Sequence, residues 1–414
     1  MVAITPFRAL RYNLERVALS DVICPPYDII SASARDTLCE RSPYNFVRLE
    51  LPRDEGALDR YAVAHRLLES WKQQGILVQE TQPAVYITEH RFQWEGQRFS
   101  RLGWIALLRF NAAVADQVLG HEATFDAPKV DRTNLLEAVR AQLSPIFCVA
   151  PDADHRLHRF LRDVAQASAP TATADVPLPR PVGRGESLGP ETIHLWAITE
   201  PTAIAALQQS LAGGQALIAD GHHRFAVAFA NRHLCGGVMT YFACADDPAL
   251  QVHPIHRVVY LGGIDPGTWQ NRLKAVCDYY PVASVEEGMR RMNEQEGPGR
   301  FLYYGGQEAA VVRVRDAVLT QDVARRAPLD VTILHQLLLP RLWGAQVPVD
   351  AVSYTPSLRE AMQMVDEVQP ACAWGLRPIP LATIVELASQ RIALPQKSTY
   401  FYPKAFAGLT IYPF

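Results

Sequence analysis

The stretch from residue 216 to residue 231 constrains the fold more than any other part of the sequence. The apolar residues Ala216 to Ala219 have the composition of a short buried strand. They lead directly into Asp220-Gly221-His222-His223-Arg224, and a helical pattern follows from Phe225 to Asn231. A strand that passes through a glycine turn into a helix is typical of proteins that mix the two kinds of element. We therefore predict a mixed α/β (α+β) fold.

The same turn has the chemistry of an anion-binding site. The first N–H groups of a helix have no partner inside the helix, and the helix dipole favours negative charge there. His222, His223 and Arg224 add donors, and an arginine can hold a phosphate with two parallel hydrogen bonds. We interpret the turn as a phosphate-binding loop. Two alternatives stay open, which are a capped helix with exposed polar side chains and a zinc site that still lacks a suitably spaced third ligand.

A second polar motif, Gly120-His121-Glu122, precedes Lys129, Asp131 and Arg132. Glu122 could act as a general base if folding brings it near the phosphate-binding loop. Lys129 and Arg132 could neutralise phosphate charge. We predict that Asp131 caps the N-terminus of a helix here. The alternative is a charged, solvated helix start with no role in chemistry.

The segment from Leu394 to Lys404 is polar and aromatic together. One interpretation is a lid or a partner surface over a site. The other is a packed terminal strand whose lysines are exposed to solvent. The sequence leaves both open.

Composition excludes several classes of protein. With 40 basic and 43 acidic residues the net charge is −3, so the chain has no cationic excess for coating nucleic acid. Apolar residues make up 49%, which is enough for a folded interior, and the first 17 residues lack the apolar core of a secretory signal. No apolar stretch approaches the ~18 residues of a membrane helix. Seven widely spaced cysteines without a C-x-x-C pattern indicate reduced thiols. We expect a cytoplasmic protein with neither a nucleic-acid nor a membrane partner.

The chain of 414 residues has room for two or three domains at ~150 residues each. The pattern of elements starts afresh after Gly262. We predict an N-terminal segment (1–84) that packs on a core, the phosphate-binding core itself (85–262), and a C-terminal α/β domain (263–414). A hairpin turn is expected at Glu95-Gly96.

Several motifs spread along the chain resemble the bacterial and archaeal "domain of unknown function 1015" family. This resemblance runs from near residue 4 to near residue 411. That family usually has His-Glu-Arg-Thr where this chain has His121-Glu122-Ala123-Thr124, so one contact with phosphate or substrate would be lost or supplied from elsewhere. The matching motifs are Pro6-Phe7-Arg8-Ala9-Leu10, Pro25-Pro26-Tyr27-Asp28, Pro43-Tyr44-Asn45-Phe46, His121-Glu122, Leu143-Ser144-Pro145-Ile146-Phe147, Ala219-Asp220-Gly221-His222-His223-Arg224 and Pro395-Gln396-Lys397-Ser398-Thr399.

Residues 85 to 260 also resemble, more distantly, the ParB and sulfiredoxin superfamily, which includes free-serine kinases. This resemblance implies a ParB/sulfiredoxin-like core with large insertions and a C-terminal α/β part. It implies Glu122 as the base, with Asp220 and His223 also in the catalytic set. It implies ATP or ADP with Mg²⁺ as cofactors, and no protein metal site is predicted. The residues expected to hold the nucleotide are Gly221, His222, His223, Arg224, Lys129 and Arg132.

Together these patterns predict a nucleotide-dependent phosphotransferase that acts on a small hydroxylated metabolite, with free L-serine as the first candidate. Sulfiredoxin-type repair is set aside because His222 stands where that chemistry needs a cysteine. One alternative is a ParB-like nucleotide switch or scaffold with little catalysis. Another is a phosphatase or hydrolase of a phosphorylated metabolite. The expected partner is a small-molecule substrate, and a homodimer could form.

Overall fold

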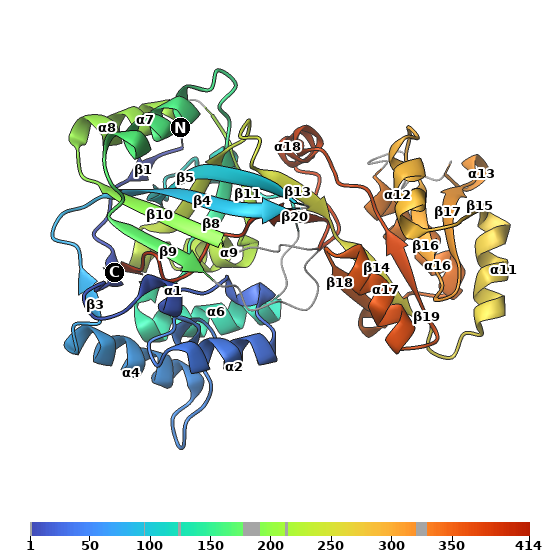
Figure 1. The fold of residues 1–414 in the computed structure, drawn as a ribbon, viewed down its shortest axis with the longest axis horizontal. Helices are drawn as coiled ribbons and strands as arrows, with labels where there is room; N and C mark the ends of the chain where they lie inside the picture. Colours follow the sequence, from blue (N-terminus) through green and yellow to red (C-terminus); the bar gives the residue numbers. More distant parts are fainter. Residues whose placement is uncertain (1, 95, 123–125, 177–190, 212–213, 320–328) are drawn as a thin grey trace.

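The computed structural model describes residues 2–94, 96–122, 126–176, 191–211, 214–319 and 329–414. The chain forms a larger body and a smaller body that lie side by side (Figure 1). The larger body is built on a nine-stranded sheet and the smaller one on a six-stranded sheet, and helices pack on both. The predicted mixed α/β class is confirmed.

The large sheet is mixed in direction. β8 pairs in parallel with β12, and β11 in parallel with β6, whereas the other neighbours are antiparallel. The expected hairpin is present, because Trp94 pairs with Gln97 across the turn. In the order of the sheet the strands are β6 (Val118–Leu119), β11 (Ala216–Asp220), β8 (Ile146–Ala150), β12 (Gly237–Cys244), β5 (Gln97–Arg109), β4 (Val85–Trp94), β10 (Glu191–Ile198) and β9 (Ala172–Val176), and β1 (Ile4–Thr5) pairs with β5.

Alternation along these strands produces two apolar faces. On β5, Trp104 packs with the cluster that includes α7, α8 and α9, whereas Ile105 packs with the cluster that includes α1 to α4 and α6. The helices of this body are α1 (Leu19–Val22), η1 (Tyr27–Ile29), α2 (Ala32–Arg41), α3 (Val47–Glu50), α4 (Arg60–Gln73), α5 (Val114–Gln117), α6 (Asp126–Val139), α7 (Arg156–Ala167), α8 (Pro201–Ser210), α9 (His222–Ala230) and α10 (Arg232–Cys235).

The smaller body has a sheet in the order β15 (Cys277–Val282), β17 (Ala309–Val314), β16 (Arg300–Tyr304), β19 (Ala371–Gly375), β14 (His256–Tyr260) and β18 (Val352–Thr355). Each neighbouring pair is antiparallel. Its helices are α11 (Pro266–Val276), α12 (Val285–Asn293), α13 (Asp316–Leu319), α15 (Asp330–Ile333), the π-helix η2 (Leu334–Leu338), α16 (Leu339–Trp343), η3 (Val349–Ala351) and α17 (Leu358–Glu367), whereas α18 (Leu381–Ser389) contacts β6 of the large sheet.

The chain crosses between the bodies more than once. β14 precedes the boundary predicted near residue 262, yet it pairs within the smaller sheet. β13 (Gln251–Pro254) and β20 (Thr399–Tyr402) pair with each other between the two bodies (Figure 1). β21 (Tyr412–Pro413) then pairs with β7 (Ala141–Gln142), and β2 (Leu10–Tyr12) with β3 (Leu77–Gln79). Both ends of the chain therefore belong to the larger body.

The helix predicted to begin at Asp131 begins five residues earlier, at Asp126, so this part of the prediction is wrong. Pro128 lies in the first turn of this helix, where a proline is tolerated because the N–H there has no helical partner. Asp131 is instead an interior position of α6. Its carboxylate accepts a hydrogen bond from the Tyr61 hydroxyl at 3.0 Å and pairs with Arg132 at 2.5 Å.

The seven cysteines are all free thiols, as the sequence predicts. Within the described part of the chain, every helix is too short or too polar to cross a membrane.

Candidate functional site

The predicted strand–turn–helix is present at the edge of the large sheet. β11 ends at Asp220, and Gly221 lies in the left-handed region with φ of +91°. A side chain at Gly221 would be strained there, and its Cβ would lie 3.0 Å from Cγ2 of Ile146. α9 begins at His222, and no side chain among the described residues caps its N-terminus. The first N–H groups of α9 are thus available to a ligand.

A cavity of about 250 Å³ lies in front of this turn. Segments from five separate parts of the chain converge on it. It brings Glu122 together with the phosphate-binding loop, as the mechanism predicted from sequence requires. The lining residues are Tyr27, Asp28, Ile29, Glu122, Ala219, Asp220, Gly221, His222, His223, Arg224, Ile255, Gln396, Lys397, Thr399, Tyr400 and Lys404.

Glu122 is held by the C-terminal segment. The backbone N–H of Ser398 donates a hydrogen bond to Oε1 of Glu122 at 3.2 Å. The preceding residue is also fixed, because the N–H of Leu394 donates to the carbonyl of His121 at 2.8 Å. Burial raises the pKa of the Glu122 carboxyl above its ordinary value, against the opposing effect of the Ser398 N–H. A carboxylate with a raised pKa is a better proton acceptor than an exposed one.

Asp220 lies at the centre of a buried charge cluster. Nη2 of Arg224 donates to its Oδ2 at 2.6 Å, and the ammonium of Lys404 forms an ion pair with Oδ1. Burial alone would raise the pKa of Asp220, but Lys404 and Arg224 outweigh it and hold the pKa at about 2. Asp220 is therefore an anion at neutral pH, and it positions cations rather than moving protons.

The two histidines of the loop differ in their surroundings. Nε2 of His222 accepts the backbone N–H of His121 at 3.2 Å, so His222 joins the loop to the turn that carries Glu122. Burial lowers the pKa of His222 well below its usual range, which keeps the ring neutral. His223 is half-buried and lines the cavity. Its pKa is also lowered, by burial first and then by the nearby cation of Lys129.

The predicted cationic residues divide between two places. Arg224 lines the cavity, but its guanidinium also donates to the Pro145 carbonyl at 2.6 Å and to the Ser144 hydroxyl at 3.1 Å. Arg132 lies outside this cavity, where it donates to the Glu50 carbonyl at 3.0 Å and covers the ring of Tyr27. Lys129 is half-buried on α6 and acts on His223 through its charge.

Sequence reasoning missed Lys404 as part of the site. One of the two interpretations of the segment from Leu394 to Lys404 expected its lysines to be exposed. Lys397 is exposed, but Lys404 is only 9% exposed. It also missed Asp28, an exposed carboxylate on the cavity wall. The family motif Pro25-Pro26-Tyr27-Asp28 has the two prolines of a rigid turn in an apolar stretch, but nothing in the sequence placed it beside residue 220. The residue Ala123, where the chain departs from the usual family motif, lies outside the described residues.

The fold and this cavity define an α/β protein in which a strand–glycine–helix turn and the carboxylate of Glu122 line the same cavity. A family model for "Protein of unknown function (DUF1015)" matches residues 4–333. The chain therefore belongs to this family, as the motifs indicated. No curated protein matches the sequence.

Several solved structures resemble the chain at low identity. SbnI with a C-terminal truncation, from Staphylococcus aureus, is 11% identical with a TM-score of 0.37, and the match covers 74% of this chain and 87% of that one. A free serine kinase variant in complex with ADP is 11% identical with a TM-score of 0.37, covering 69% and 84%. A conserved hypothetical protein from Pyrococcus furiosus is 12% identical with a TM-score of 0.33, covering 69% and 88%. Likenesses this low leave the function to be argued from the site.

Proposed function

We propose that the protein transfers a phosphoryl group from ATP or ADP to the hydroxyl of a small metabolite, with free L-serine as the first candidate. One observation carries the proposal, which is that Glu122 and the N-terminus of α9 line the same cavity. Phosphoryl transfer needs positioning and charge neutralisation, together with a group that accepts the proton of the attacking hydroxyl. The described residues of this cavity supply all three.

The loop supports binding of the nucleotide phosphates. Gly221 has no side chain, so a phosphate can approach the N–H groups at the start of α9. Lys397 also lines the cavity, and its exposed side chain offers an ammonium. Lys404 also lines the cavity and adds positive charge there, and its ion pair with Asp220 holds it in place. His223 adds a ring nitrogen that can donate in its neutral form.

Glu122 would act on the acceptor. As the acceptor oxygen bonds to the terminal phosphorus, its proton passes to the Glu122 carboxylate. The bond from that phosphorus to the bridging oxygen breaks, and ADP leaves when ATP is the donor, or AMP when ADP is. The N–H of Ser398 holds the carboxylate in one orientation, which a base in a transfer reaction requires.

Mg²⁺ fits this site as a companion of the nucleotide rather than as a resident ion. The described residues contain no group of three or more histidine, cysteine or acidic side chains that could hold a metal by themselves. Mg²⁺ commonly binds through one or two carboxylates together with substrate phosphates. Asp28 is the exposed carboxylate of the cavity wall that would contribute. The ion would neutralise phosphate charge.

A ligand screen tests the proposal. The thermal shift of the protein is measured with ATP, ADP, CTP and GTP, each with Mg²⁺, with and without serine, and ³¹P NMR follows the products. We expect stabilisation by an adenine nucleotide and a phosphorylated product only when the acceptor is present. Lys397→Met should weaken nucleotide binding about tenfold through loss of a charge-assisted contact. The matched control is Arg391→Met, because Arg391 is an exposed cation shortly before this segment in the chain and pairs with Asp116 outside the cavity.

Other outcomes would identify the alternatives. Nucleotide binding with a changed oligomeric state and no transfer would favour a switch. Release of inorganic phosphate from a phosphorylated metabolite without a nucleotide would favour a hydrolase. The absence of stabilisation by every nucleotide would refute the proposal.

A further inference from the structure

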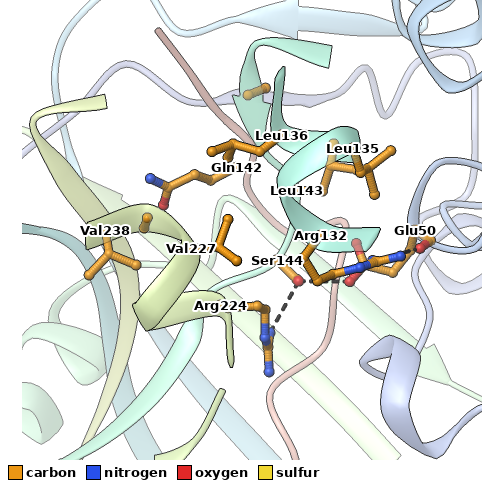
Figure 2. Close-up of a pocket in the computed structure, with 12 residues that line it drawn as sticks. Glu50, Arg132, Leu135, Leu136, Gln142, Leu143, Ser144, Arg224, Val227 and Val238 are labelled. Atoms are coloured by element: carbon orange, nitrogen blue, oxygen red, sulfur yellow. Dashed lines mark hydrogen bonds between the residues drawn. The ribbon is translucent and has the colours of Figure 1, made fainter. Parts of the chain in front are cut away.

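A second, smaller cavity of about 50 Å³ lies behind Arg224, between α6 and α9 (Figure 2). One end is apolar, with Leu135 and Leu136 of α6 and Val227 of α9 on its wall. The other end is polar, and Figure 2 shows the side chains of Glu50, Ser144 and Arg224 meeting there. The cavity thus shares Arg224 with the candidate functional site.

The carboxylate of Glu50 is the unusual feature of this polar end. Glu50 is the last residue of α3 and is 1% exposed. Its Oε1 accepts the hydroxyl of Ser144 at 2.8 Å, whereas its buried Oε2 has no hydrogen-bond partner among the described residues. A buried carboxylate with one oxygen unpaired is costly. Among the described residues, Arg132 of α6 donates to the backbone carbonyl of Glu50 rather than to this carboxylate, so Oε2 stays unpaired.

Arg224 shows the complementary feature. Nη1 of Arg224 donates to Oγ of Ser144 at 3.1 Å, so the serine hydroxyl relays between the carboxylate and the guanidinium. Nε of Arg224 is also buried without a partner among the described residues. The two unpaired atoms thus belong to residues that line the same small cavity. Its volume is sufficient for a water molecule, which needs ~10–15 Å³ of this kind of space.

We propose that Glu50 is a positioning residue of the candidate site. It holds the Arg224 guanidinium through the Ser144 hydroxyl, and a water in the small cavity satisfies its own Oε2. Arg224 in turn fixes Asp220, and Asp220 fixes Lys404 on the wall of the larger cavity. The N-terminal segment, which carries Glu50, therefore orients the anion site from the side of the smaller cavity. This role deepens the proposed function and rests on it for its effect on ligand binding.

A double-mutant cycle tests the relay, with the binding of MgADP measured by calorimetry. Glu50→Gln keeps the shape and an acceptor for Ser144 but removes the charge. We expect about tenfold weaker binding, the size of one hydrogen bond to a charged group. Arg224→Lys should weaken binding at least as much, and the double variant should be no weaker than Arg224→Lys alone. The relay would be overturned if the two losses of affinity multiply in the double variant. It would also be overturned if Glu50→Gln binds MgADP within twofold of the wild type.

Asp152→Asn is the matched control. Asp152 is a buried carboxylate, 5% exposed, that accepts the N–H groups of Leu157 and His158 at the start of α7, away from the cavity. It should lower thermal stability as Glu50→Gln does while leaving MgADP affinity unchanged. Weaker MgADP binding by Asp152→Asn to the same degree would show that general destabilisation explains the effect, and the relay would fall.

Crystal structures of the wild type and of Glu50→Gln without nucleotide provide a readout that does not depend on the proposed function. The relay predicts a water on Oε2 of Glu50 and intact Glu50–Ser144–Arg224 hydrogen bonds in the wild type, and a displaced guanidinium in the variant. An unchanged Arg224 with all its contacts intact would refute the positioning role even if the protein binds nucleotide. A displaced Arg224 in a protein that binds no nucleotide would refute the proposed function and leave the positioning role standing.

Discussion

Replacement of Lys404 by methionine removes one of the two cations that hold Asp220, while the apolar part of the side chain is kept. The pKa of Asp220 lies at about 2 in the folded protein, against an ordinary value of 3.8. Because the folded-state pKa is the lower one, ionised Asp220 favours folding at every pH above 3.8, and this contribution is lost as the pH falls through about 2. At about 1.4 kcal/mol for each pH unit of difference, it amounts to ~2.5 kcal/mol at neutral pH.

We therefore expect Lys404→Met to lower the free energy of unfolding by about 2 kcal/mol at pH 7, since Arg224 remains as a partner and limits the loss. Urea unfolding at several pH values measures it, and the difference from the wild type should shrink as the pH falls from 5 toward 2. Lys397→Met is the control, because that lysine is exposed and should change stability by less than ~0.5 kcal/mol. A loss that stays constant over this pH range would refute the reasoning, as would no loss at all.

Three further predictions concern the loop and the base. Gly221→Ala forces a side chain into the left-handed region against Ile146, and should lower the free energy of unfolding by at least ~1 kcal/mol in urea. The transfer rate should fall on the acid side with an apparent pKa above 4.5, because burial raises the pKa of Glu122 and the protonated form cannot act as the base; a rate unchanged down to pH 4 would contradict this role. His222→Ala removes the acceptor of the His121 N–H, so turnover should fall about tenfold or more while ADP affinity changes less, as steady-state kinetics and calorimetry would show.

Local patterns in the sequence were sufficient for the elements that carry the loop. The apolar run before Asp220 and the glycine after it predicted β11 and the start of α9, because strand length and glycine freedom are local properties. The hairpin between β4 and β5 followed from two alternating segments around a short turn. The start of α6 could not be placed in the same way, since Asp131 has the chemistry of a cap but lies inside the packed helix.

Contacts between distant segments were beyond the reach of such patterns. Lys404 pairs with Asp220 across 184 residues, and periodicity predicts which side of a strand a residue occupies but not which segment covers it. Glu50 reaches Ser144 across 94 residues for the same reason. The pairing of β13 with β20 likewise brings Lys397 and Lys404 to the cavity, which no local signal near residue 400 indicated.

The role of Glu122 is the central claim, and the Glu122→Gln variant tests it most directly. Its amide keeps an oxygen that can accept the Ser398 N–H but cannot take a proton from the acceptor. We predict that MgADP binds the variant within a fewfold of the wild type while transfer to serine or another accepted alcohol falls by ~10²-fold or more. Full turnover by Glu122→Gln with any accepted substrate would contradict the account.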